Sequence, residues 1–245
     1  MEPAIRIEGL SKDFSDGWGR KGHMALEALS LDISKGELVG VFGGNGSGKS
    51  TLLKLLCGLL QPTRGSLEIA GNSPAKSIRE DLIGYLPERP GFPTYQSPRK
   101  LLTLFAKLSG LSGSILDDRV NACLNRCRLE SQADVPVVKL SKGGIQRLAM
   151  AQALIHDPQV LLLDEPMDGL DPLALEGVEK LVQDLRDEGK TVLISSHLVR
   201  GMETLCDRVL ILHNGRSIFF GPPDFEEGME SWILKRLRDE EAVHG

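Results

Sequence analysis

The stretch GGNGSGKS, residues 43–50, decides the fold, because it matches the pattern G-x-x-x-x-G-K-[ST] at every fixed position. A short apolar run, LVGVF at residues 38–42, precedes it, and apolar side chains at helical spacing follow over residues 50–60. Glycines let the backbone N–H groups of such a loop turn toward an anion, and the positive end of the next helix faces the same anion. The sequence therefore predicts a strand, a phosphate-binding loop and a helix, in that order.

The residues of this loop have separate expected parts in binding a nucleoside triphosphate. Lys49 would reach the β- and γ-phosphates as a point charge, and the Ser50 hydroxyl would bind Mg²⁺. The residues that we expect to contact the nucleotide are Gly43, Gly44, Asn45, Gly46, Ser47, Gly48, Lys49, Ser50 and Thr51.

A second stretch, VLLLDEP at residues 160–166, is an apolar strand that ends in two carboxylates. The carboxyl ends of parallel strands face the ligand crevice of an open α/β sheet. We expect Asp164 to hold magnesium through water, and Glu165 to orient the attacking water or to accept its proton. Phosphoryl transfer needs alignment and charge stabilisation more than covalent chemistry, so this pair suits hydrolysis of the nucleotide.

Composition and charge narrow the class of protein. The chain has 245 residues, of which 41% are apolar and 26% are charged, as in ordinary globular proteins. Its formal net charge is −5 and it has no dense Lys/Arg run, so we expect no nucleic-acid partner. The first residues lack the apolar core of a signal peptide, and no apolar run approaches the ~20 residues that span a bilayer. We therefore expect a cytosolic protein that reaches a membrane only through another chain.

The four cysteines, Cys57, Cys123, Cys127 and Cys206, form no C-x-x-C pair. Cys123 and Cys127 are four residues apart, which places them on one face of a helix. A zinc site would need two further ligands, and no histidine lies near them in the sequence. We expect reduced thiols packed inside the domain.

Strand and helix patterns alternate along the chain, which predicts an α/β fold with a parallel sheet covered on both faces. Alternating apolar residues near the N-terminus predict antiparallel strands, and residues 97–147 are mostly helical. We predict one domain over residues 1–221, with a helical subdomain at about residues 89–150. Residues 222–245 would form a C-terminal helix or tail that docks on its own domain, with contact to a partner as the alternative.

Five further segments give the chain a resemblance to the ABC ATPase family over nearly its whole length. Residues 140–144, LSKGG, resemble the signature usually written LSGGQ, and they stand about 24 residues before Asp164, the spacing usual in the family. Residues 84–88, GYLPE, occupy the place of the Q-loop. Residues 169–171 resemble the D-loop, residues 195–197 resemble the H-loop, and Phe14 stands where the family stacks adenine.

The resemblance implies a P-loop NTPase (RecA-like) core and a particular division of labour. Two such domains sandwich two ATP molecules head to tail, so that the signature residues Ser141, Gly143 and Gly144 would meet the ATP held by the other chain. His197 would contact the γ-phosphate of its own site, and Asp171 would cross to the partner's site. Phe14 would stack on adenine, with Trp18 as the alternative.

Several positions depart from the commonest family pattern. Glu88 stands where glutamine is usual and would still meet Mg²⁺ or water through a carboxylate oxygen. Lys142 replaces the first signature glycine, and Gly144 replaces the signature glutamine. Met167 and Asp168 replace the usual Thr/Ser-Asn pair. The glutamate and the lysine both resemble exporter-type cassettes.

The resemblance implies an enzyme that hydrolyses ATP with Mg²⁺, using Lys49, Glu165, Asp171 and His197. We expect it to be the ATP-binding subunit of a transporter, most plainly an exporter, working as a homodimer beneath a separate transmembrane permease on the inner face of the cell membrane. Phe92 and Tyr95 are candidate permease contacts, and the alternative interpretation is that both pack in the core of the helical subdomain. The alternative function is a soluble ABC ATPase that acts as an ATP-driven clamp outside transport.

Overall fold

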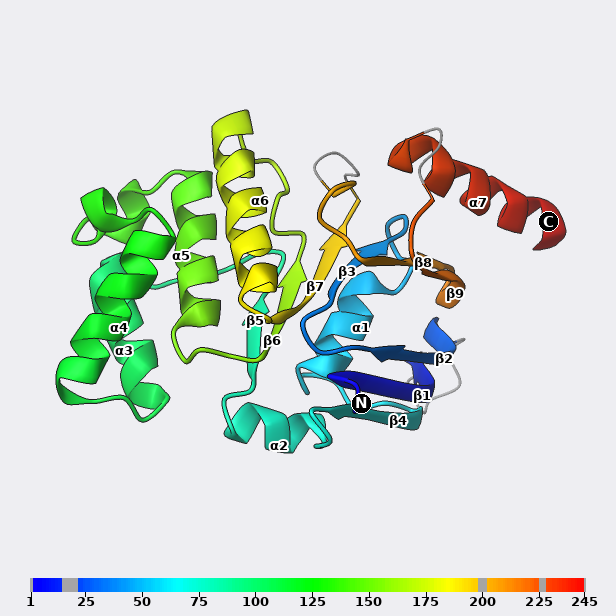
Figure 1. Cartoon of the computed structure of the whole chain (residues 1–245), viewed down its shortest axis with the longest axis horizontal. Coiled ribbons are helices and arrows are strands. Elements are labelled where there is room, and N and C mark those ends of the chain that lie inside the picture. Colours follow the sequence, from blue (N-terminus) through cyan, green and yellow to red (C-terminus); the bar gives the residue numbers. More distant parts are fainter. Residues whose placement is uncertain (1, 15–21, 198–201, 225–227, 245) are drawn as a thin grey trace.

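The main sheet has six strands in the order β5-β6-β7-β3-β8-β9, in a computed structural model that describes residues 2–14, 22–197, 202–224 and 228–244 (Figure 1). The first five of these strands run parallel, and β9 pairs antiparallel with β8. Their bounds are β3 (Leu38–Phe42), β5 (Ile83–Leu86), β6 (Val160–Asp164), β7 (Thr191–Ser196), β8 (Arg208–His213) and β9 (Arg216–Gly221).

A second, antiparallel sheet has the order β2-β1-β4, with β1 (Ile5–Asp13), β2 (Met24–Ile33) and β4 (Arg64–Ile69). Helix α1 (Lys49–Leu56) lies between the two sheets (Figure 1), and its buried leucines share one hydrophobic core with residues of both. This core fixes the start of α1 at the edge where β3 ends, which is where the phosphate-binding loop lies.

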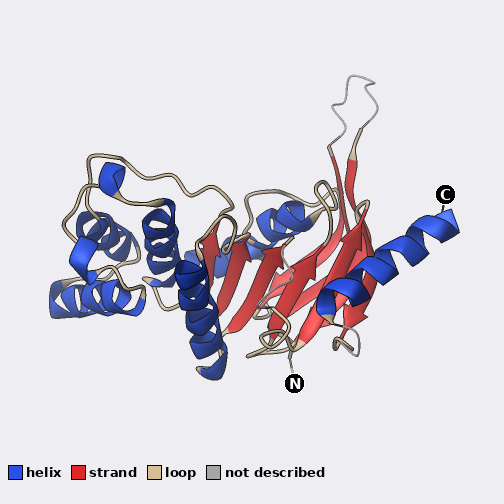
Figure 2. Cartoon of the chain, turned by 90° about the horizontal axis from the view of Figure 1, so that it is seen from above, coloured by secondary structure: helices blue, strands red, loops and turns tan. Residues whose placement is uncertain are grey.

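Four longer helices and two short 3₁₀ turns pack beside the main sheet. They are α3 (Pro98–Leu108), α4 (Gly113–Arg126), α5 (Lys142–Leu154) and α6 (Pro172–Asp187), with 3₁₀ turns at Glu130–Gln132 and Val137–Lys139. Their apolar faces share a second core with β6, β7 and β8. Figure 2 shows the block of α3 to α5 at one end of the sheets and the C-terminal helix at the other.

The central strands are buried on both faces. Every residue of β3, β6 and β7 is buried, as expected for parallel strands covered by helices on each side. The register sets Asp164 opposite Ser195 and Phe42 opposite Ser196. Parallel strands end at one edge, so the phosphate-binding loop, the Asp164–Glu165 pair and His197 come together there.

The predicted fold class is confirmed, and the structure adds elements that the sequence patterns did not indicate. Strand β5 takes up part of the GYLPE segment, helix α2 (Pro74–Arg79) is a short addition, and α1 ends at Leu56 rather than at residue 60. Both added elements are six residues or shorter, which leaves too few side chains for a periodic pattern to appear.

The C-terminal helix α7 (Met229–His244) rests on the chain itself. Met229 and Ile233 are buried, and the Trp232 ring meets Phe219 of β9 edge to face at 4.8 Å. The sequence spacing would also put Phe225 on this helical face, but Phe225 lies outside the described residues. The helix therefore docks through its first two turns.

All four cysteines are buried and free. Burial raises the pKa of Cys57 and Cys123 to about 11, and that of Cys127 and Cys206 to about 12. Thiols in this state are poor nucleophiles at neutral pH. Among the described residues, no helix is both long and apolar enough to pass through a membrane.

Candidate nucleotide site

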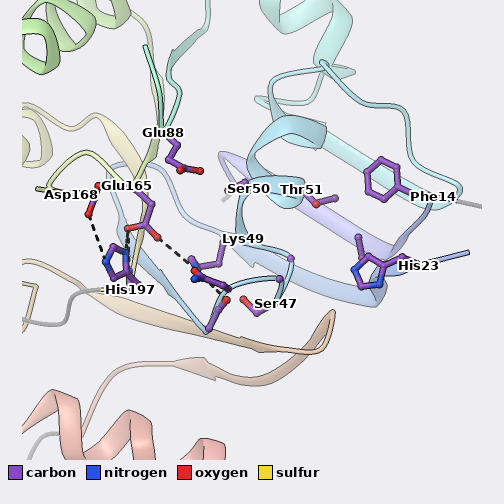
Figure 3. A pocket seen from close by; sticks show the side chains of 15 residues that line it. Phe14, His23, Ser47, Lys49, Ser50, Thr51, Glu88, Glu165, Asp168 and His197 are labelled. Atoms are coloured by element: carbon purple, nitrogen blue, oxygen red, sulfur yellow. Dashed lines mark hydrogen bonds and ion pairs between the residues drawn. The ribbon is translucent and has the colours of Figure 1, made fainter. Parts of the chain in front are cut away.

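A cavity of about 430 Å³ opens at the carboxyl edge of the main sheet (Figure 3). Its walls come from the residue after β1, the start of β2 with the residue before it, the phosphate-binding loop, the start of α1 and the loops after β5, β6 and β7. The residues that line it are Phe14, His23, Ala25, Gly44, Asn45, Gly46, Ser47, Gly48, Lys49, Ser50, Thr51, Glu88, Glu165, Asp168 and His197. The cavity thus joins residues from four of the predicted motifs (the phosphate-binding loop, the GYLPE segment, the carboxylate pair and residues 195–197) with the predicted adenine-stacking residue Phe14.

The phosphate-binding loop depends on glycine at two tight positions. Gly43 and Gly48 have φ angles of +152° and +111°. A Cβ atom added to Gly43 would lie 2.3 Å from the Leu212 carbonyl oxygen, and one added to Gly48 would lie 2.6 Å from that of Ala25. No other residue fits this path, which leads the chain straight into α1 at Lys49.

Lys49 is held over the loop with its ammonium group partly committed to backbone carbonyls. Nζ donates to the Gly43 oxygen at 2.8 Å and to the Gly44 oxygen at 3.3 Å, and only 7% of the residue is exposed. Nζ also lies 3.7 Å from Glu165 Oε1. These contacts keep the cation inside the cavity, where a phosphate group can meet it.

The Ser47 hydroxyl also indicates that a phosphate group binds in this loop. It is buried, lines the cavity, and has no hydrogen-bond partner among the described residues. Leaving a buried hydroxyl unpaired costs about 1–3 kcal/mol. A phosphate oxygen in the loop would satisfy it, together with the N–H groups at the start of α1.

Asp164 is almost fully buried and accepts two hydroxyl hydrogen bonds on the same oxygen. Ser50 Oγ donates to Oδ1 at 3.1 Å, and Ser195 Oγ donates to it at 2.7 Å. Burial raises the pKa of Asp164 above its usual value, while the two hydrogen bonds oppose that rise and the charges of Glu165 and Glu88 add to it. A cation placed next to this carboxylate would relieve the cost of burying it.

Glu165 faces the phosphate-binding loop because the backbone turns sharply after β6. Its φ angle is +50°, a left-handed conformation that costs a glutamate about 1–3 kcal/mol and tends to occur at functional sites. Its N–H group donates to Ser195 Oγ at 3.0 Å, which fixes this turn against β7. The carboxylate points toward Lys49 on one side and His197 on the other (Figure 3).

His197 is held by Glu165 through both its backbone and its ring. The backbone N–H donates to Oε2 at 3.1 Å, and ring atom Nδ1 lies 2.8 Å from the same oxygen. On its other side, Nε2 is 3.8 Å from Oδ1 of Asp168. The imidazole therefore stands between two carboxylates at the wall of the cavity.

The available donors fit a magnesium ion. Ser50, Asp164 and Glu88 offer only oxygen atoms, which are the ligands that Mg²⁺ prefers, and the ion commonly binds through one or two carboxylates plus phosphate and water. No cluster of three or more His, Cys, Asp or Glu side chains suited to a metal occurs in the described part of the chain. Bound by Ser50 and Asp164, the ion would neutralise charge on the phosphate oxygens.

The opposite end of the cavity is lined by ring side chains. Phe14 is 48% exposed, and Figure 3 shows it beside His23, to which it is linked by a backbone hydrogen bond from Phe14 N–H to the His23 oxygen. An exposed aromatic face of this kind suits stacking against a nucleobase. Trp18, the predicted alternative, lies outside the described residues.

The predicted signature residues lie elsewhere in the same chain. Ser141 and Asp171 line a second cavity of about 370 Å³. Each caps the N-terminus of a helix, α5 or α6: Ser141 Oγ accepts from the Gly144 N–H at 3.2 Å, and Asp171 Oδ1 accepts from the Ala174 N–H at 2.9 Å. Within the described residues, neither of them, nor Gly143 or Gly144, lines the first cavity.

Three residues of this site were missed by the sequence reasoning. Ser195 bridges Asp164 and the Glu165 backbone, Asp168 faces His197, and His23 lies beside Phe14. The sequence signal for Ser195 was its place two residues before His197, at the end of an apolar strand. Asp168 stood out only as a departure from the family pattern, and His23 had no pattern around it.

Fold and site together define a P-loop nucleotide-binding protein, with a parallel sheet, a glycine-rich loop and a carboxylate pair at the carboxyl edge. The family described as ABC transporter matches residues 26–168, more than half of the chain. The chain belongs to this family of ATP-binding cassette proteins, which confirms the resemblance drawn from the motifs.

Curated relatives agree with this assignment. The chain is 32% identical to the uncharacterized ABC transporter ATP-binding protein MJ1023 of Methanocaldococcus jannaschii, over 90% of this chain and 78% of that protein. It is 37% identical to Nod factor export ATP-binding protein I of Sinorhizobium fredii, over 90% of this chain and 63% of that protein. Part of each relative's length therefore has no counterpart here.

Solved structures with the same fold are ABC cassettes as well. The dimeric cassette MJ0796, in a post-hydrolysis state bound to ADP and Pi, has a TM-score of 0.81 at 27% identity, covering 89% of this chain and 98% of that one. CbiO1 of Clostridium perfringens, part of the transporter complex cbiONQ, has a TM-score of 0.81 at 29% identity, covering 99% of this chain and 96% of that one.

Proposed function

We propose that this chain is the Mg²⁺-dependent ATP-hydrolysing subunit of an exporter, acting as a head-to-tail homodimer beneath a transmembrane permease. The observation that carries the proposal is the division of the motifs between two cavities. Lys49, Glu165 and His197 converge on one cavity, whereas Ser141 lies at the other. A second copy turned head to tail would bring its Ser141 to the open side of the first cavity.

A small number of residues would carry out ATP hydrolysis in this site. Lys49, the Ser47 hydroxyl and the N–H groups at the start of α1 hold the phosphates, and Phe14 stacks on the base. Glu165 orients the attacking water and accepts its proton, as its 2.8 Å contact with His197 keeps the carboxylate aimed into the cavity. His197 contacts the γ-phosphate. Ser195 fixes Asp164 and the Glu165 backbone in one arrangement.

The second chain completes the site. Ser141 caps the N-terminus of α5, and the positive end of that helix with its free N–H groups suits an anion. In the proposed dimer, Ser141, Gly143 and Gly144 of one chain contact the γ-phosphate held by the other, and Asp171 crosses to the partner's site. The solved dimer of MJ0796 supports association of this kind in the family.

Two exposed apolar side chains on the helical block support a permease partner. Tyr95 is 77% exposed and Val138 is 68% exposed, and their chain segments lie side by side because Val138 N–H donates to the Thr94 oxygen. Phe92, the other candidate, packs against the core instead. We place the chain in the cytoplasm, on the inner face of the membrane, since ATP is supplied there.

Export is the proposed direction of transport. Its support is the similarity to the Nod factor export ATP-binding proteins, of which the one from Sinorhizobium fredii is 37% identical. Glu88 and Lys142, the two departures typical of exporter-type cassettes, point the same way. Co-purification with a membrane protein would separate this role from that of a soluble ATP-driven clamp.

Complementation between two inactive variants tests the head-to-tail site. Lys49→Ala damages the phosphate loop and Ser141→Arg damages the signature, so each homodimer has two broken sites. In a mixed dimer one site combines the intact loop of one chain with the intact signature of the other. We expect the mixed dimer to have up to about one half of the wild-type ATPase activity, so that an equal mixture with random pairing should recover up to about one quarter.

The matched control mixes Lys49→Ala with Glu165→Gln, because both changes fall on the same side of a site. That mixture should stay inactive. If Lys49→Ala and Ser141→Arg together also stay inactive while each still forms dimers, the signature does not act across the interface.

A further inference from the structure

Asp168 lies between two motifs that the proposed function assigns to different nucleotide sites. Its Oδ2 atom is 3.2 Å from Lys142 Nζ, at the start of α5. Its Oδ1 atom is 3.8 Å from His197 Nε2, the contact drawn in Figure 3. One carboxylate thus connects the signature segment of a chain with the histidine of that same chain.

The backbone around Asp168 is shaped to admit the lysine. Gly169 has a φ angle of +62°, and a Cβ atom added to it would lie 2.1 Å from Lys142 Nζ. A side chain at this position would displace the ammonium group from Asp168. The next signature residue, Gly143, also lies near this segment, since a Cβ added there would lie 3.9 Å from the Leu170 side chain.

The pair does little for folding stability. The Lys142 and Asp168 side chains are 61% and 49% exposed, and ion pairs as exposed as this contribute little to the free energy of unfolding. Asp168 instead provides a second carboxylate beside the His197 imidazole, next to the ring nitrogen that Glu165 does not contact. Glu165 holds Nδ1 at 2.8 Å, and Asp168 stands 3.8 Å from Nε2.

We propose that Asp168 is a positioning residue through which Lys142 acts on ATP hydrolysis in its own chain. This inference rests on the proposed head-to-tail dimer. When the signature of one chain closes on the partner's γ-phosphate, the start of α5 moves, and Lys142 and Asp168 carry that movement to His197. Each chain then hydrolyses its own ATP at a rate set by whether the partner's ATP is in place.

Mixed dimers distinguish this action within a chain from ordinary capping across the interface. One chain, the silent chain, carries Glu165→Gln, so that only the ATP on the other, live chain is hydrolysed. Lys142→Met is then placed in either chain, and the rate constant of a single turnover is measured from labelled phosphate release. The two chains carry different affinity tags so that only mixed dimers are assayed.

We expect Lys142→Met to slow the turnover by roughly 3- to 10-fold in the live chain and by less than about 2-fold in the silent chain, from the usual size of couplings between contacting charged residues. The affinity of the live chain for ATP should stay unchanged, because Lys142 does not line its cavity. The matched control is Lys139→Met, which removes another exposed lysine three residues earlier and should leave the rate unchanged in either chain.

A double-variant cycle tests whether both residues act through one contact. Asp168→Asn in the live chain should slow the turnover by a similar factor, and adding Lys142→Met to it should cause no further loss. Independent, multiplying effects would overturn the proposal. So would slowing by Lys142→Met only from the silent chain, which would make the lysine a capping residue.

Ser141→Arg in the silent chain checks the proposed function separately. It should stop hydrolysis on the live chain whatever Lys142 does. If Ser141→Arg has no effect there, the head-to-tail arrangement fails. If it stops hydrolysis while Lys142→Met has no effect in the live chain, only the coupling through Asp168 fails.

Discussion

Replacing Ser195 with alanine should destabilise the protein more than an ordinary buried serine would. Ser195 is fully buried, donates to Asp164 Oδ1 at 2.7 Å and accepts from the Glu165 N–H at 3.0 Å. Its loss removes a hydrogen bond to a buried carboxylate and leaves a backbone N–H group without its acceptor. The turn that aims Glu165 into the cavity loses its anchor at the same time.

The size of the effect follows from the two broken contacts. A hydrogen bond to a charged group contributes about 1.5–3 kcal/mol, and an unsatisfied buried group costs about 1–3 kcal/mol. Allowing for partial relaxation, we expect Ser195→Ala to lower the free energy of unfolding by about 3 kcal/mol. Ser77→Ala is the matched control, because Ser77 is also fully buried and donates one bond, to the Ile69 oxygen; it should cost about 1 kcal/mol.

The pH dependence of the effect identifies Asp164 as its cause. Burial raises the folded-state pKa of Asp164 above its usual value, and the Ser195 hydrogen bond opposes that rise. A raised pKa means that folding stability is lost as the pH rises from the unfolded value through the folded one. Ser195→Ala raises the folded pKa further, so its cost should be larger at neutral pH than in acid, where the carboxyl is protonated in both states.

Urea unfolding of the nucleotide-free protein, followed by circular dichroism at neutral and acidic pH, measures both quantities. A cost for Ser195→Ala equal to that of Ser77→Ala would refute the bridging role of Ser195. A large cost that did not change with pH would place the damage at the Glu165 backbone rather than at Asp164.

Three further changes test other parts of the structure. Lys49→Ala should weaken ATP binding in calorimetry by about 10- to 100-fold, the worth of a charge-assisted contact, while Lys54→Ala on the exposed face of α1 should not. His197→Ala should slow single-turnover hydrolysis at least ~10-fold with ATP affinity nearly unchanged, and a loss of affinity alone would contradict its assigned role. Trp232→Ala should lower the free energy of unfolding by about 2 kcal/mol, because the ring packs on Phe219 and Arg236; exposed Leu234→Ala should stay within ~0.5 kcal/mol, and equal effects would contradict the docking of α7.

The fold could be predicted because its long elements carry strong patterns. The loop at residues 43–50 fixed the order strand, loop, helix, and buried runs such as residues 160–163 marked the central strands. Short elements had no such signal. Strand β5 is four residues long and α2 is six, so their positions depend on contacts with distant parts of the chain.

The site residues that belong to recognisable sequence motifs could be predicted. Lys49, Glu165, Glu88 and His197 stand in the motifs, and the structure brings them to one cavity. Ser195 could not be assigned from the sequence, because its role depends on the register that sets it opposite Asp164. The placing of Asp168 between His197 and Lys142 likewise comes from three segments that meet only in the folded chain.

The left-handed turn at Glu165 is a further feature hidden from sequence reasoning. Glycine or asparagine often marks such a conformation, and a glutamate gives no sign of it. Its φ angle of +50° is kept because the Ser195 hydroxyl and the His197 backbone hold both the N–H group and the carboxylate. The catalytic role proposed for Glu165 depends on this turn.

The central claim is that ATP joins two copies of this chain through the loop of one and the signature of the other. The most direct test is the mass in solution of the Glu165→Gln variant, with and without Mg-ATP, by light scattering after size-exclusion chromatography. We predict a monomer without nucleotide and a dimer with it, and a second change, either Lys49→Ala or Ser141→Arg, should abolish the dimer. A Glu165→Gln variant that binds Mg-ATP and remains a monomer would contradict the claim.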